Sequence, residues 1–138
     1  MIFENIKKKE HFLDLWKNKD NKEQFDSDDA LMLSIMENHK RFHDVFNSPD
    51  VYDILNKKSA EDPFFHITIH YLLQKQLLSQ EPPEVKKAFD ILSGRGVPEK
   101  RILHGLGLVL ADEMFTMLKN KASFNENSYR KRIASFIE

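Results

Sequence analysis

The segment from Pro98 to about Asn120 constrains the fold more than any other part of the chain. Its apolar residues fall on nearly every side of a helix: Ile102, Leu103, Leu106, Leu108, Val109, Leu110, Met114, Phe115, Met117 and Leu118. A helix that is apolar all round packs in the centre of a bundle. Gly105 and Gly107 would each cost about 1 kcal/mol relative to alanine in such a helix, which favours close approach of another helix at their level. The pattern therefore predicts a buried central helix at about 98–120.

A second well-marked helix begins at Asp62 and Pro63. The Asp62 side chain can cap the free amides of the first turn, and Pro63 stands where a missing N–H costs nothing. At 100° per residue, His66, His70 and Leu73 fall on one stripe about 60° wide. The two histidines therefore continue the apolar face of this helix.

Other segments with helical spacing of apolar residues are separated by polar, proline or glycine-containing loops. They cover residues 3–18, 27–46, 51–57, 84–93 and 129–137, with Asn38 as a candidate break in the second. A chain of 138 residues with 41% hydrophobic and 31% charged residues suits one folded domain. The sequence predicts an all-α fold: a single compact irregular helical bundle of five to seven helices, forming one domain over 1–138.

The absence of cysteine restricts any metal site to histidine and carboxylate ligands. His66 and His70 are one helical turn apart on a predicted buried face, and two imidazoles at that spacing can chelate one ion. The central helix carries three polar exceptions, His104, Asp112 and Glu113. We therefore predict a divalent metal site (Zn, Fe, Mn or Ni) between the two buried helices, with His66, His70, His104 and Asp112 or Glu113 as ligands.

The carboxylates support this prediction, because a buried acid needs a partner. Arg101, Lys119 or a metal ion can each serve. His104 and Asp112 lie about 80° apart on the helix, whereas Glu113 points about 180° from His104, so only one acid can share its face.

Two alternatives stay open for these groups. They can form a satisfied polar network in the core of a structural or protein-interaction module, or act in metal-free acid–base chemistry. His39 and His43, a second pair at the same spacing, are secondary metal candidates that flank the core stripe of the helix at 27–46. His11 has no patterned partner and is interpreted as structural.

The sequence lacks the motifs that are typical of several function classes. Ile67 stands where a zinc protease would carry its glutamate base. The loop from Gly94 to Pro98 matches neither a phosphate-binding loop nor a dinucleotide fingerprint, so no nucleotide or flavin cofactor is predicted. The formal net charge of −1 argues against nucleic acid as a partner, and the basic clusters Lys7–Lys9 and Arg130–Arg132 are interpreted as solvated faces.

The N-terminus carries no apolar run of signal-peptide length, and no stretch approaches the ~18 apolar residues of a membrane span. The expectation is a cytoplasmic protein with no membrane partner. The sequence leaves the partner and the oligomeric state open.

Two motifs carry a resemblance to a known family. They are Asp62-Pro-Phe-Phe-His66-Ile-Thr-Ile-His70, with Gln76 and Pro83 downstream, and His104-Gly-Leu-Gly-Leu-Val-Leu-Ala-Asp112-Glu113-Met-Phe. The chain resembles the bacterial domain of unknown function 1841 family over most of its length, including Glu37-Asn-His39 and the segment from Phe124 to Ile133. The family usually has Asn and Pro where this chain has Asp62 and Lys40. The resemblance implies a small helical bacterial protein with no established activity, so it does not decide whether the protein is an enzyme.

Overall fold

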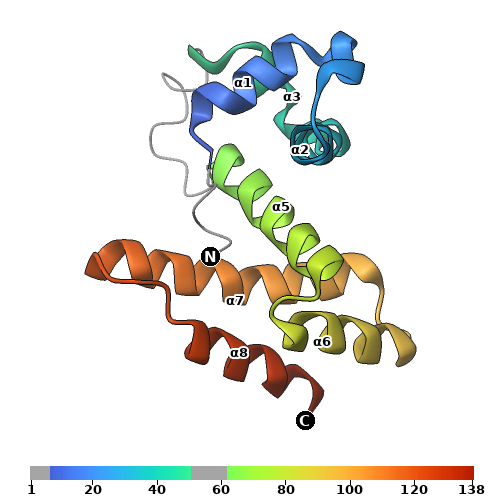
Figure 1. The fold of residues 1–138 in the computed structure, drawn as a ribbon, viewed down its shortest axis with the longest axis vertical. Coiled ribbons are helices and arrows are strands. Elements are labelled where there is room, and N and C mark those ends of the chain that lie inside the picture. Colours follow the sequence, from blue (N-terminus) through green and yellow to red (C-terminus); the bar gives the residue numbers. More distant parts are fainter. Residues whose placement is uncertain (1–6, 51–61) are drawn as a thin grey trace. The chain divides into compact units, whose positions relative to one another are not determined.

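Every element that the structure describes is a helix. The computed structural model describes residues 7–50 and 62–138, and these ranges contain no strand. The predicted all-α class is confirmed, whereas the short helix predicted at 51–57 lies outside the described residues. The chain divides into two compact units, Met1–Tyr71 and Leu72–Glu138, with one helix passing from the first to the second (Figure 1). The prediction of a single domain stays a prediction.

The first unit is built from short helices around an aromatic core. Its elements are α1 (Lys9–Lys17), η2 (Lys19–Gln24), α2 (Ser27–Asn38), η3 (Lys40–Phe42), α3 (His43–Asn47) and the first half of α5 (Pro63–Ser79). Buried rings meet where α1, α3 and α5 converge: the centroid of Phe64 lies 5.7 Å from that of Phe12 and 5.8 Å from that of Phe46. These rings hold the start of α5 in the first unit.

The helix predicted at 27–46 is interrupted after Asn38. His39 has φ −98° and ψ 67°, and its backbone N–H bonds to the carbonyl of Met36, so the α-helical pattern ends there. The chain continues as the 3₁₀ turn η3 and then as α3. The candidate break at Asn38 is therefore confirmed.

The start of α5 follows the prediction from Asp62 and Pro63. The Asp62 carboxylate accepts a hydrogen bond from the amide of Phe64 at 2.9 Å, and the Asp62 carbonyl accepts the first helical bond from the His66 amide. The helix therefore begins at Pro63, and residues 66 and 70 lie in its first two turns.

The second unit consists of α6 (Pro83–Gly94), α7 (Glu99–Asn120), α8 (Glu126–Ala134) and η4 (Ser135–Ile137), together with the end of α5. In Figure 1, α8 runs alongside α6 and α7, and contacts join each pair of these three helices. A hydrogen bond of 2.7 Å from the Tyr129 hydroxyl to the Gln76 amide oxygen connects α8 to the end of α5. Both side chains are buried, and this burial raises the pKa of Tyr129.

The predicted central helix is α7, but it is buried on one face only. Ile102, Leu106 and Leu110 are buried on that face. In contrast, Leu108 and Leu118 are 59% and 60% exposed. The sequence predicted burial on nearly every side. The difference arises because α6 and α8 occupy only part of the circumference of α7 within the second unit.

At Gly105 the close neighbour is a side chain, whereas the sequence predicted the close approach of another helix. A Cβ atom at this position would lie 3.4 Å from the Cε1 atom of the Phe136 ring. The neighbour identified at Gly105 is therefore an aromatic side chain of η4, where the sequence predicted a packed helix.

No helix in the described part of the chain is both long and apolar enough to cross a membrane.

Candidate metal centre

Three histidines of the first unit form a cluster: His39, His66 and His70. One ring nitrogen from each lies within 4.8 Å of the other two. The ring centroids are 4.6 Å apart for His39 and His70, 4.8 Å for His66 and His70, and 5.1 Å for His39 and His66. All three side chains are half-buried. We call this group the histidine cluster.

The break after α2 positions His39 and selects its tautomer. Because the His39 amide bonds to Met36, the carbonyl of Ile35 is left without its usual helical donor. The His39 Nδ1 atom lies 2.7 Å from that carbonyl oxygen. A carbonyl can only accept, so Nδ1 carries the proton and the Nε2 lone pair of neutral His39 is available to a metal. A backbone bond of this kind is the usual support of a metal-binding histidine.

His66 and His70 have the spacing that one shared ion requires. Their Nε2 atoms are 3.2 Å apart. Two nitrogens bound to one tetrahedral ion, at about 2.1 Å each, lie about 3.4 Å apart. The pair therefore fits an ion with almost no movement. Because all three ring nitrogens lie within 4.8 Å of one another, none has to approach another by more than about 1.4 Å to reach the separation of about 3.4 Å.

An aromatic and a cationic side chain adjoin the histidine cluster. The buried ring of Phe42 lies with its centroid 5.3 Å from that of His66, and it is stacked with His39 at 6.0 Å and an interplanar angle of 5°. The guanidinium carbon of Arg41 lies 4.4 Å from the Phe42 ring centroid, and its Nη2 atom is 3.4 Å from Nε2 of His66.

His43, a secondary candidate from the sequence, has a structural contact instead. Its Nε2 atom lies 3.1 Å from the carbonyl oxygens of both Met36 and Glu37, at the end of α2. Since Nε2 must donate to these acceptors, it cannot bind a metal in this arrangement. His11 pairs with Asp29 at 2.7 Å, in line with its structural interpretation.

The other predicted ligands, His104, Asp112 and Glu113, belong to α7 in the second unit. His104 and Asp112 are exposed, and only Glu113 is buried. Their role as ligands of an ion at His66 and His70 stays a prediction.

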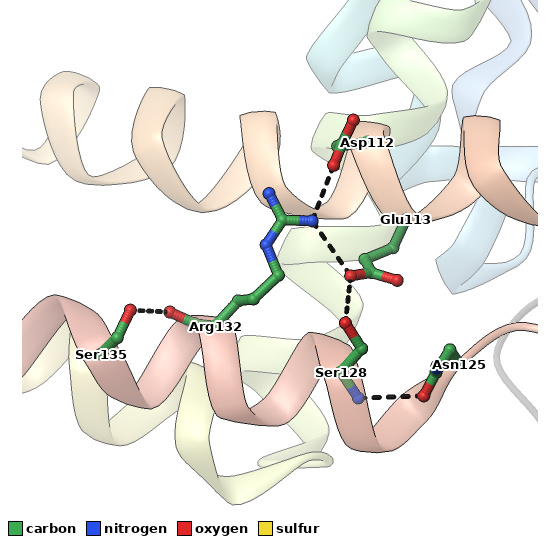
Figure 2. A network of polar contacts seen from close by, with 6 residues as sticks. All are labelled: Asp112, Glu113, Asn125, Ser128, Arg132 and Ser135. Atoms are coloured by element: carbon green, nitrogen blue, oxygen red, sulfur yellow. Dashed lines mark hydrogen bonds and ion pairs between the residues drawn. The ribbon is translucent and has the colours of Figure 1, made fainter.

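The buried Glu113 carboxylate has protein partners on α8 (Figure 2). Its Oε1 atom accepts hydrogen bonds from Ser128 Oγ at 2.6 Å and from Arg132 Nη1 at 3.0 Å, and the same Nη1 atom bonds to Asp112 at 2.7 Å. Hydrogen bonds to Glu113 and Asp112 raise the pKa of the Arg132 guanidinium. The partner that a buried acid requires is therefore Arg132, where the sequence suggested Arg101, Lys119 or a metal.

The comparison with family models agrees with the resemblance seen in the motifs. A family described as "Domain of unknown function (DUF1841)" matches residues 4–135, which is nearly the whole chain. No curated protein and no solved structure matches the chain. The match covers the histidine cluster and the carboxylate network of α7 alike, and the chain belongs to the DUF1841 family.

Proposed function

We propose that the first unit binds one divalent transition-metal ion through His39, His66 and His70. The convergence of three imidazole nitrogens within 4.8 Å of one another carries this proposal. The set retains His66 and His70 from the sequence prediction and adds His39, which the sequence ranked second. Imidazole ligands suit zinc, iron and nickel better than manganese, which prefers oxygen.

The geometry supports a site with an open position. Within residues 7–50 and 62–138 the cluster has three protein ligands, which leave a fourth tetrahedral position for water or a substrate, as in catalytic zinc sites. Neutral imidazoles do not reduce the charge of the ion, so they favour ionisation of a bound water. A role in metal-assisted hydrolysis or hydration is therefore chemically compatible with the histidine cluster.

The rival function is a structural or interaction module in which the histidines satisfy one another. The contact between the two Nε2 atoms of His66 and His70 favours it, because one neutral imidazole can donate to the other without an ion. The two functions differ in one measurable property, the stoichiometric binding of metal.

The test uses the full chain without a histidine tag, stripped with a chelator and titrated with Zn²⁺ and Ni²⁺ by calorimetry. We expect one ion per chain. We expect His39→Ala, His66→Ala and His70→Ala each to weaken binding by about 100-fold or more, because each removes a direct ligand. His11→Gln is the matched control and is expected to bind normally.

A further variant separates this ligand set from the one predicted from sequence. His104→Ala leaves affinity unchanged if the histidine cluster is the site, and lowers it if His104 is a ligand. Absence of stoichiometric metal, together with an unchanged melting temperature on adding Zn²⁺, would show that the histidines form a structural network.

A further inference from the structure

We infer that the open position of this metal centre takes a small oxyanion, which Arg41 binds at the same time. The inference rests on the proposed metal site and names the class of ligand or substrate that the site would accept. The small oxyanions in this class are carboxylates, carbonate and phosphate groups. Each presents two or more oxygens bound to one central atom.

The position of Arg41 is the first observation. Its Nη2 atom lies 3.4 Å from Nε2 of His66, a nitrogen that is also 3.2 Å from Nε2 of His70. The guanidinium is therefore next to the nitrogens that would hold the ion. Its contact with the ring of Phe42, at 4.4 Å, steadies it there, and Phe42 is buried.

The second observation is the positive charge at the proposed site. The three clustered side chains are histidines, and neutral imidazoles leave the full charge of a divalent ion in place. A guanidinium beside one ligand atom adds a further positive charge within a few ångströms. An anion that contacts both the ion and the Arg41 guanidinium is attracted by both positive charges.

The geometry of the guanidinium selects the kind of anion. Arginine presents five N–H donors in a planar fork that matches carboxylate and phosphate oxygens, so it can donate to such a ligand while other donors keep other partners. An oxyanion can place one oxygen on the ion and a second on the fork. A halide has a single atom, so it cannot place separate atoms on the ion and on the guanidinium.

The experiment uses the full chain loaded with Co²⁺, whose visible absorption reports a change of ligand at the ion. Inorganic phosphate and sodium acetate are titrated separately, with chloride as the comparison anion. We expect phosphate or acetate to shift the spectrum to saturation, with chloride at least about tenfold weaker. The stronger of the two oxyanions distinguishes a phosphate-bearing from a carboxylate-bearing ligand.

Substitutions in the 3₁₀ turn η3 test whether Arg41 is the residue that binds the oxyanion. Arg41→Gln is expected to weaken oxyanion binding about tenfold or more, because it removes a charge-assisted hydrogen bond, while Co²⁺ stoichiometry stays at one. Arg41→Lys keeps the positive charge and loses the planar set of donors. It is expected to bind oxyanions more weakly than the unmodified chain and more tightly than Arg41→Gln. Lys40→Gln is the matched control: it removes the same charge from the adjacent exposed residue and is expected to leave anion binding unchanged.

Four outcomes would overturn the inference. If Co²⁺ binds but neither oxyanion alters its spectrum, or if Arg41→Gln binds oxyanions as well as the unmodified chain, the metal site stands and the inference fails. If Arg41→Gln only tightens Co²⁺ binding, Arg41 opposes the metal instead of serving its ligand. A chain that binds no Co²⁺ overturns the inference together with the proposed function.

Discussion

A backbone carbonyl determines which nitrogen of His39 can bind a metal. The Ile35 oxygen fixes the proton on Nδ1 and leaves Nε2 as the ligand atom. The neighbouring His43 has the opposite arrangement, because its Nε2 atom is used by the carbonyls of Met36 and Glu37. Two histidines from one sequence pair thus differ in which ring nitrogen donates to the backbone, and only His39 keeps its Nε2 atom for the proposed metal site.

Tyr129 predicts a specific loss of stability in alkaline solution. Its folded pKa is raised by burial, so above its ordinary value of about 10 the unfolded chain loses this proton while the folded chain keeps it. The free energy of unfolding therefore falls as the pH rises above about 10. Urea denaturation at pH 8 and pH 11 measures this change. The free energy of unfolding should fall less between the two pH values for Tyr129→Phe than for the unmodified chain. Equal falls would mean that Tyr129 is not responsible.

Glu113 and Asp112 allow the effect of burial on one ion-pair network to be measured. Both accept from Arg132, but the side chain of Glu113 is 7% exposed and that of Asp112 is 63% exposed. We expect Glu113→Gln to lower the free energy of unfolding by about 1.5–3 kcal/mol, the range for a hydrogen bond to a charged group. Asp112→Asn, the same change at the surface, should cost about 0–1 kcal/mol. Equal losses from denaturation curves would contradict this account of the network.

The short helices of the first unit show how the end of one element can create a site. Because α2 stops at Asn38, its last carbonyls need donors from outside the helix. His39 and His43 supply them. The same interruption takes His39 out of the helical register, so its predicted position beside the core stripe of an unbroken helix at 27–46 does not apply.

Two glycines of the second unit should respond to alanine in opposite directions. Gly105 lies inside α7, and a new Cβ would meet the Phe136 ring at an ordinary contact distance of 3.4 Å. Alanine there should stabilise the chain by up to about 1 kcal/mol through helix propensity. Gly96 has φ +86°, which alanine adopts only with strain, so Gly96→Ala should lower stability. Thermal denaturation of both variants provides the comparison, and a destabilising Gly105→Ala would mean that the Phe136 ring cannot adjust.

For the molecule as a whole, the division into two units predicts where a bound metal acts. Zinc at about 100 times its dissociation constant should raise the free energy of unfolding by about 2.7 kcal/mol. Hydrogen exchange should then slow at the end of α2, in η3 and in the first half of α5, which carry the histidine cluster. The amides of α8 in the second unit serve as the internal reference. Slowing concentrated around His104 on α7 would instead favour the ligand set predicted from sequence.

The all-α class, the start of α5 at Asp62 and Pro63, and the facing of His66 and His70 were predictable from sequence because each depends on local spacing and capping. Packing between segments decided the rest. His39 joined the pair through a helix break, Glu113 found Arg132 on another helix, and α7 kept one face exposed. These outcomes depend on which elements meet in space, and the periodicity of one segment contains no information about its neighbour.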